Sequence, residues 1–311
     1  MSSKKPLFAF FGTPHLSVCV LDRLEASGFL PALVVTAPDR PSGRGLALTP
    51  SPVREWATER GIDVLTPETL SDQDFLAELS NTDWDVFIVA MYAKLIPKTI
   101  LDLPQHGTLN VHPSLLPKFR GPSPVLSAIL ADLPAQTGER ATGVSIMLLT
   151  EGMDEGPVIA QAKIELEEGG EDGPGRQDGG WPPKGSVFEE LLATEGGNLL
   201  AESMPFWLRG ELPAEPQDNT QATYTKKFTT QDALIDLAGN ARENYLKIRA
   251  FDQSPRAHFF AERGEKKVRV IVTDAQIVEG KLEILKVIPE GKKEMDYSVF
   301  MAGSGTRAQN L

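Results

Sequence analysis

The sequence predicts a two-domain α/β protein, with a doubly wound, mostly parallel, Rossmann-like sheet followed by a smaller β-barrel-like domain. Apolar, β-branched runs typical of strands buried on both faces alternate with helix-patterned segments in the first two thirds of the chain. Short strand patterns without intervening helices follow residue 250. The length, 311 residues, also exceeds that of an average single domain.

In the first domain, the strands are expected at 6–12, 30–37, 62–67, 85–91 and 107–113, and then at 141–152 and 156–166. The helices between and after them are expected at 15–27, 52–61, 71–80 and 187–203. No helix pattern separates the last two strands, which predicts an adjacent pair that closes the sheet. A loop rich in Pro and Gly is expected at 38–52.

The domain boundary is expected in a polar, Pro-containing linker, residues 209–223, between a first domain 1–208 and a second domain 224–311. A helix at 238–250 and the strands that follow predict a small OB-like barrel. Gln276–Gly280 leads almost directly into the next strand, so the barrel is expected to be open and one hairpin short. The Gly- and acid-rich stretch 167–186 shows no periodicity and is expected to be a loop.

Composition and charge exclude several classes of protein. No apolar run reaches the ~20 residues of a membrane span, and the apolar start breaks at Gly12-Thr13-Pro14, which predicts a strand and not a signal peptide. Cys19, the single cysteine, excludes an internal disulfide and favours the cytoplasm. The net charge of −12 is uneven, because residues 221–311 hold 15 Lys and Arg against 12 Asp and Glu. A polyanion is therefore expected to contact the C-terminal part.

Nucleotide and metal motifs are missing from the sequence. The first strand is followed by Gly12-Thr13-Pro14 and not by G-x-G-x-x-G, and no G-x-x-x-x-G-K-[ST] occurs. The four histidines show no clustered ligand spacing, so no metal is expected.

Asn110 and His112 are the strongest candidates for chemistry. They alternate along the strand 107–113, so both side chains lie on one face near its carboxyl end, where open α/β sheets bind ligands. An amide that polarises a carbonyl and an imidazole that transfers a proton suit an acyl transfer, and a carboxylate would stabilise the charged ring. Asp154, in a Gly-flanked turn, is the best-placed acid. The same residue types also form strand-end caps and turns, and that alternative stays open.

The stretch Asn110-Val111-His112-Pro113-Ser114-Leu115-Leu116-Pro117-Lys118-Phe119-Arg120-Gly121, followed by Glu151-Gly152-Met153-Asp154-Glu155-Gly156, resembles the signature of the 10-formyltetrahydrofolate-dependent formyltransferases. The resemblance implies that Asn110, His112 and Asp154 are the catalytic residues. It also implies a folate site, as formyl donor co-substrate, at Ser114, Leu115, Leu116, Pro117, Met91, Tyr92 and Leu95.

Pro38-Asp39-Arg40-Pro41-Ser42-Gly43-Arg44-Gly45 resembles the loop of the methionyl-tRNA formyltransferases, which contacts the acceptor arm of initiator tRNA. Arg40 and Arg44 would supply phosphate contacts there. Residues after 223 resemble the tRNA-contacting domain of these enzymes, and the basic residues expected to serve it are Lys226, Lys227, Arg249, Lys266 and Lys267. Leu46-Ala47-Leu48 stands where family members often carry lysines, which predicts a weaker grip on the acceptor stem.

Two alternatives are kept. An amino-sugar-nucleotide N-formyltransferase would share the Asn, His and Asp but leave the loop at 38–45 unexplained. A non-catalytic RNA-binding relative would not need the three catalytic residues together. A cytoplasmic monomer, with initiator Met-tRNA and folate as partners, is the expectation.

Overall fold

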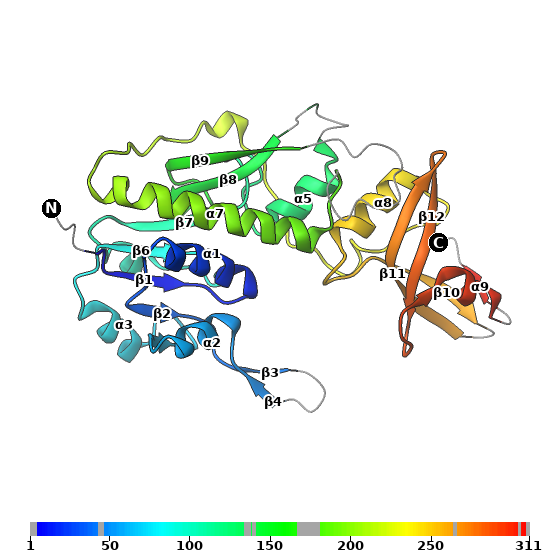
Figure 1. Ribbon diagram of the computed structural model, residues 1–311, viewed down its shortest axis with the longest axis horizontal. Helices are drawn as coiled ribbons and strands as arrows, with labels where there is room; N and C mark the ends of the chain where they lie inside the picture. The colour runs from blue at the N-terminus through cyan, green and yellow to red at the C-terminus, as the bar shows by residue number, and fades with distance from the viewer. Residues whose placement is uncertain are drawn as a thin grey trace. The chain divides into compact units, whose positions relative to one another are not determined.

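The computed structural model describes residues 5–42, 47–133, 138, 141–166, 181–263, 266–303 and 306–308 (Figure 1). They fall into two units, which are described separately. Unit 1 comprises 1–121, 143–164 and 189–224, and unit 2 comprises 122–142, 165–188 and 225–311. Unit 1 thus takes in the segment expected to be a linker, while the domain boundaries at 208 and 224 stay a prediction.

A seven-stranded sheet in the order β5-β2-β1-β6-β7-β8-β9 forms unit 1. Its strands are β1 (Phe8–Phe11), β2 (Leu33–Val35), β5 (Asp63–Leu65), β6 (Val86–Val89), β7 (Thr108–His112), β8 (Ala141–Leu148) and β9 (Val158–Glu165). The first five strands of this order pair in parallel, and β8 pairs antiparallel with β7. The mostly parallel sheet is as predicted.

Helices cover both faces of this sheet, as a doubly wound fold requires. They are α1 (His15–Ala26), α2 (Pro52–Glu59), α3 (Gln73–Ser80), α4 (Lys98–Leu101) and α7 (Gly185–Leu208). The side chains of Ser51 and Asp72 accept hydrogen bonds from Arg54 N (3.1 Å) and Phe75 N (2.9 Å), which caps α2 and α3.

Strand alternation divides the buried side chains between the two faces. Phe87 and Val89 of β6 pack with Phe75 of α3 and Ile100 of α4 in one apolar cluster. On the opposite face, α7 crosses β7 and β8 (Figure 1), where a Cβ on Gly196 would lie 2.4 Å from Val111 Cγ1. The residues of β7 with even numbers therefore lie on the face away from α7.

The loop expected at 38–52 is, in part, a hairpin. Strands β3 (Arg40–Ser42) and β4 (Ala47–Thr49) pair antiparallel, with Arg40 opposite Thr49. Pro41 has no backbone N–H group. It is tolerated in β3 because this strand pairs with β4 on one side, so its residues need not all donate a backbone hydrogen bond. An ion pair of 2.7 Å between Arg54 and Asp39 lies at the base of this hairpin.

In unit 2, five strands form an antiparallel sheet in the order β13-β12-β11-β10-β14. They are β10 (His258–Arg263), β11 (Lys266–Val278), β12 (Lys281–Pro289), β13 (Met295–Asp296) and β14 (Thr306–Ala308). Glu279 and Gly280, both with positive φ, turn β11 directly into β12, as the short connection predicted. The tail, for which no structure was predicted, contributes β14 to the sheet edge.

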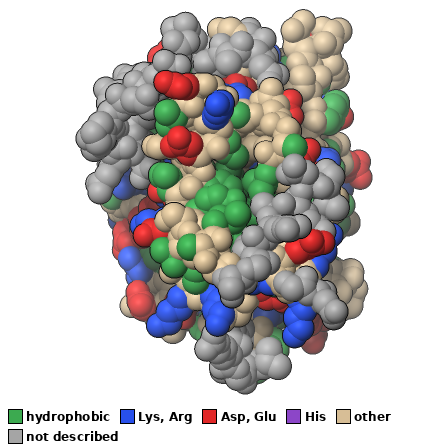
Figure 2. Space-filling model, turned by 90° about the vertical axis from the view of Figure 1, so that its right-hand side faces the viewer, with side chains coloured by type: hydrophobic (Ala, Val, Ile, Leu, Met, Phe, Trp, Pro, Cys, Tyr) green, Lys and Arg blue, Asp and Glu red, His purple; other side chains and the backbone are tan. Residues whose placement is uncertain are grey.

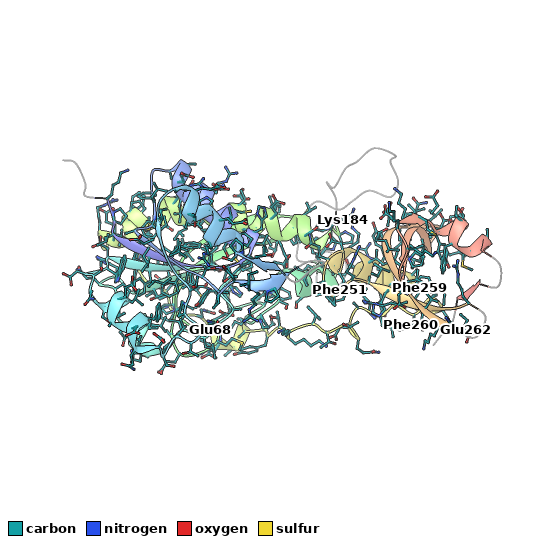
Figure 3. All side chains as sticks on the ribbon, turned by 90° about the horizontal axis from the view of Figure 1, so that it is seen from below. Glu68, Lys184, Phe251, Phe259, Phe260 and Glu262 are labelled. Carbon is teal, nitrogen blue, oxygen red and sulfur yellow. The ribbon has the colours of Figure 1, made fainter. Side chains whose placement is uncertain are left out.

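Three helices accompany this sheet: α5 (Pro124–Leu130), which the sequence did not predict, α8 (Ala241–Ala250) and α9 (Tyr297–Ala302). Phe251 and Phe259, labelled in Figure 3, are about 1% exposed and anchor the apolar interior, whereas Glu262 is exposed. Of the helices described, none is both long and apolar enough to cross a bilayer.

The molecular face in Figure 2 mixes Lys and Arg with Asp and Glu around a central apolar area. The side chains drawn there form no continuous basic stripe.

Asp132 is a buried carboxylate of unit 2 and is 2% exposed. It connects Arg242 of α8 with Trp181, which lies just before α7. Its oxygens accept hydrogen bonds from Arg242 Nη2 (2.7 Å), Arg242 Nε (2.9 Å) and Trp181 Nε1 (2.9 Å). Burial raises its pKa, but the donors of Arg242 and Trp181 outweigh burial, so the pKa of Asp132 is lowered.

We therefore expect Asp132→Asn to lower the free energy of unfolding by about 1–3 kcal/mol at neutral pH, because Arg242 loses its charged partner. Because the pKa of Asp132 is lower in the folded than in the unfolded protein, the ionised carboxylate stabilises the fold at pH values above 3.8, the pKa in the unfolded chain. That stabilisation is lost as the pH falls through the pKa of the folded protein. In urea unfolding experiments, the difference in the free energy of unfolding between wild type and variant should thus narrow as the pH falls below 3.8. Asp83→Asn, at an exposed position, is the control. Equal stabilities at neutral pH would contradict the assignment.

Candidate active site

Asn110 and His112 lie side by side on β7, on the sheet face away from α7. Asn110 is half-buried and pairs in register with Val89 and Met147, and His112, 4% exposed, pairs with Ser145. Among the described residues no side-chain hydrogen bond is found for the Asn110 amide. Its donor is therefore available to a bound carbonyl group.

Asp154 lies in the turn between β8 and β9. Leu148, at the end of β8, is opposite Leu109, so the turn folds back along β7 towards His112. Asp154 Oδ2 lies 3.8 Å from His112 Nδ1 and accepts a hydrogen bond of 2.6 Å from Gly121 N. The turn lies against β8, since a Cβ on Gly156 would be 1.8 Å from Leu148 O. The three candidate residues are thus brought to one place, with an electrostatic contact between ring and carboxylate.

Burial sets the charge of His112. It lowers the pKa of the ring below 6.5, while the Asp154 carboxylate and the Phe119 carbonyl act in the opposite direction. Phe119 O lies 3.0 Å from Nε2 and can only accept, so Nε2 carries the proton of the neutral ring. Nδ1 is then unprotonated and faces Asp154. This nitrogen can take up a proton, and the carboxylate stabilises the cation that forms.

The turn after β7 contains the residues predicted for folate, Ser114, Leu115, Leu116 and Pro117. Ser114 is 1% exposed, and its hydroxyl donates to Lys118 O at 2.6 Å. Ser145 Oγ donates to Ser114 O (2.7 Å) and accepts from Leu116 N (3.0 Å), and Gln161 Nε2 donates to Leu116 O (2.9 Å). The Ser114 hydroxyl and the backbone of Leu116 therefore hold this turn, and the half-buried Leu115 and Pro117 are the members open to a ligand.

The carboxyl ends of β1 and β6 form the switch point of the sheet, where chain connections leave in opposite directions. Gly12 ends β1 so close to β6 that a Cβ would lie 2.9 Å from Ala90 O. Met91 and Tyr92, both half-buried, follow β6, and Leu95 is 89% exposed. Tyr92 packs edge-on against Phe11, and its buried hydroxyl has no partner among the described atoms. Burial raises the pKa of Tyr92 to about 12, so the hydroxyl keeps its proton as a donor.

The basic residues predicted for tRNA have different surroundings. Arg40 is exposed on β3, while Arg44 lies outside the described residues. In unit 2, Lys227, Lys266 and Lys267 are exposed.

Three of these basic residues have internal partners. Lys226 forms an ion pair with Asp232, Arg249 donates to Pro182 O at 2.9 Å, and the Lys267 ammonium group lies 4.7 Å from the centre of the Phe260 ring. Arg40, Lys227, Lys266 and Lys267, for which no hydrogen-bond acceptor or carboxylate partner is found among the described residues, are thus the stronger candidates for a phosphate.

Sequence reasoning missed Arg120 and Gln217. Arg120 was part of the quoted motif but was given no role, and its side chain is fully buried. Gln217, in the expected linker, accepts from Arg120 and donates to Asp154 O (2.8 Å) and Gly156 O (2.6 Å). No pattern in the sequence links a polar linker residue to a turn some sixty positions earlier.

One group with metal-ligating chemistry occurs among the described residues, although none was expected. His15 and Cys19 of α1 and Glu190 of α7 have potential ligand atoms within 4.8 Å of one another. His15 and Glu190 are exposed. Burial, and then the carboxylates of Glu190 and Asp22, raise the pKa of the Cys19 thiol, so without a metal it stays protonated.

The chain is similar to known proteins of one family. Residues 4–173 match the family model described as formyl transferase. A methionyl-tRNA formyltransferase of Chloroflexus aggregans is 38% identical, with 94% of this chain and 96% of that protein covered. The structure of a methionyl-tRNA formyltransferase from Clostridium thermocellum has a TM-score of 0.56 at 14% identity, covering 94% of this chain and 100% of that chain. An N-formyltransferase from Helicobacter canadensis, in complex with folinic acid and dTDP-3-aminofucose, has a TM-score of 0.57 at 15% identity, covering 89% and 94%. At these identities the two structures establish the fold alone.

The electrostatics of the site can be tested without a substrate. The pKa of His112 is expected below 6.5, and Asp154→Asn should lower it further because the ring loses the attraction of the carboxylate. Titration of the histidine resonances by NMR measures both values. Glu151→Gln, which removes an exposed charge from the same turn, is the matched control. A pKa of His112 that is unchanged in Asp154→Asn would show that the two groups do not interact.

Proposed function

This chain belongs to the formyl transferase family, and we propose that it transfers the formyl group of 10-formyltetrahydrofolate to the amino group of methionine on initiator tRNA. The observation that carries the proposal is the convergence of Asn110, His112 and Asp154 at the edge of the sheet. Similarity over nearly the full length to methionyl-tRNA formyltransferases supports the tRNA substrate.

The surroundings of the switch point fit a folate. Folate supplies the formyl group in an activated form, bound to its N10. The unpartnered Tyr92 hydroxyl, the exposed Leu95 and the backbone after β6 offer a donor, an apolar surface and polar main-chain groups. Leu115 and Pro117 would face the same ligand from the turn after β7. That a related N-formyltransferase was crystallised with folinic acid supports this class of donor.

Three side chains divide the chemistry. The Asn110 amide donates to the formyl oxygen, where negative charge grows as the methionine amine attacks the carbonyl carbon. His112 Nδ1 accepts the proton released by the amine and returns it to the nitrogen that leaves when the old C–N bond breaks. Asp154, held by Gly121 N, stabilises the charged imidazole.

The amino-sugar-nucleotide alternative is less well supported. The hairpin β3–β4, with the exposed Arg40, stands at the carboxyl edge of the sheet without a role in such an enzyme. A non-catalytic relative would not require the unpartnered Asn110 amide beside a buried imidazole. We expect the enzyme to act as a monomer in the cytoplasm.

His112→Ala and Asp154→Asn should each lower kcat by about 10²–10⁴-fold while Met-tRNA binding is largely kept, because proton transfer is lost and the binding surface is not. Initial rates with 10-formyltetrahydrofolate and charged initiator tRNA measure the loss. An amino sugar nucleotide, offered in a parallel assay, tests the alternative acceptor. Glu151→Gln, in the same turn, controls for general damage. Full activity in either catalytic variant would reject these roles.

Lys266→Ala and Lys267→Ala should weaken tRNA binding and each reduce the slope of log Kd against log salt by about one, because each removes one released counterion. Lys226→Ala should have a smaller effect, since Asp232 already neutralises that ammonium group. Filter binding over a range of salt concentrations provides the slopes. The charge-preserving Lys267→Arg should bind like the wild type, and slopes unchanged in both alanine variants would remove these lysines from the interface.

A further inference from the structure

The segment from Glu215 to Tyr224 is attached to the active-site side of unit 1, although its composition predicted a linker. Glu215 pairs with Val158 through both backbone bonds, each 2.8 Å. Thr223 O accepts from Arg120 N at 2.9 Å, and Thr223 Oγ1 accepts from Phe119 N at 2.8 Å. The segment is therefore fixed to the residues next to both catalytic turns.

Arg120 provides the strongest of these attachments. Its guanidinium is fully buried and donates to Gln217 Oε1 through Nε (3.0 Å) and Nη2 (2.8 Å), to Asn219 Oδ1 (2.7 Å) and to the Tyr224 hydroxyl (3.2 Å). A carboxylate, that of the half-exposed Glu155, lies only at 3.7 Å. A buried cation requires such partners, so the segment cannot leave without exposing or stranding this charge.

The two-pronged bond from Arg120 decides how the Gln217 amide is oriented. The guanidinium donors hold the amide oxygen, so the NH₂ group must point the other way. It donates to Asp154 O at 2.8 Å and to Gly156 O at 2.6 Å. Gln217 thus binds, through two hydrogen bonds, the backbone of the turn that carries the Asp154 carboxylate.

That turn needs an external hold. Asp154 has a φ of +53°, in a region that non-glycine residues seldom adopt. Among the described atoms, its carboxylate accepts a hydrogen bond from Gly121 N, which holds it beside His112, and Gly121 is the residue that follows Arg120. Phe119 O, on the other side of Arg120, accepts from the His112 ring. The partners of both catalytic side chains therefore flank Arg120.

We propose that Gln217 is a positioning residue for the His112–Asp154 pair, with its amide oriented by Arg120. The 215–224 segment is then part of the catalytic apparatus and not a passive connection. This inference rests on the proposed function, in which Asp154 stabilises the charged imidazole. If Gln217 had only a structural role, its substitution would lower the stability of the fold. It would not selectively change the pKa of His112 or kcat.

Gln217→Glu separates the two roles. The new carboxylate still accepts hydrogen bonds from Arg120, so the segment stays attached. It has no N–H group, so the hydrogen bonds to Asp154 O and Gly156 O are lost and oxygen atoms face these carbonyl groups instead. Displacement of the turn should lower kcat about 10–100-fold, with KM for each substrate within about twofold. The pKa of His112 in the free protein should fall, and the acid limb of kcat/KM should move with it.

Two further variants complete the test. Gln221→Glu, the same change at an exposed position of the segment, should behave like the wild type. Gln217→Met is similar in shape but has no hydrogen-bonding groups. Arg120 keeps Asn219 Oδ1 and the Tyr224 hydroxyl as acceptors in this variant, so the segment stays attached. It should lower kcat and the His112 pKa in the same direction as Gln217→Glu, without adding a charge.

The outcomes are distinguishable. A wild type that forms no formyl-Met-tRNA would refute the proposed function. An active wild type with unchanged kcat and an unchanged His112 pKa in Gln217→Glu and Gln217→Met would refute the positioning role alone. A lowered kcat without a shift of the His112 pKa would also overturn it, because the loss would then not act through the pair.

Discussion

The burial of the His112 imidazole at the end of β7 constrains the rest of the site. A ring removed from water needs a partner for its proton and a counter-charge for its cationic form. Phe119 O meets the first need, and Asp154, across 3.8 Å, meets the second. Both partners come from turns and not from the sheet, so the chain must bring two turns to one strand end and hold them there.

The sheet supplies the rigid half of the arrangement. Parallel strands fix Asn110 and His112 two residues apart on one face, and the antiparallel β8 returns the chain alongside them. Ser145, on β8, fixes the turn after His112 through two hydrogen bonds of its hydroxyl. The turn that carries Asp154 follows β8 and is held by hydrogen bonds from Gly121 N and from the Gln217 amide. Regular structure thus defines the amide and the imidazole, and side-chain bonds define the carboxylate.

Local rules explain what the sequence could predict. The alternation of side chains along the strand 107–113 places Asn110 and His112 on one face. Apolar strand segments that alternate with helix-patterned segments predict the parallel sheet. The hairpin β3–β4 was missed because Pro and Gly in 38–52 indicate a loop, and pairing between Arg40 and Thr49 leaves no periodic signal in three-residue strands. Arg120 and Gln217 lie 97 positions apart. Only the folded chain shows that one is buried and that the other completes its shell, because neither residue type predicts burial.

The attachment of residues 215–224 bears on how this enzyme can be divided for laboratory use. A fragment cut at 208, where composition suggests the first domain ends, would strand the Arg120 guanidinium and lose the amide that grips the neighbouring turn. A fragment that continues through Tyr224 retains both. Truncation limits chosen from amino-acid composition can therefore remove a residue that holds the turn of Asp154 while leaving Asn110, His112 and Asp154 in place.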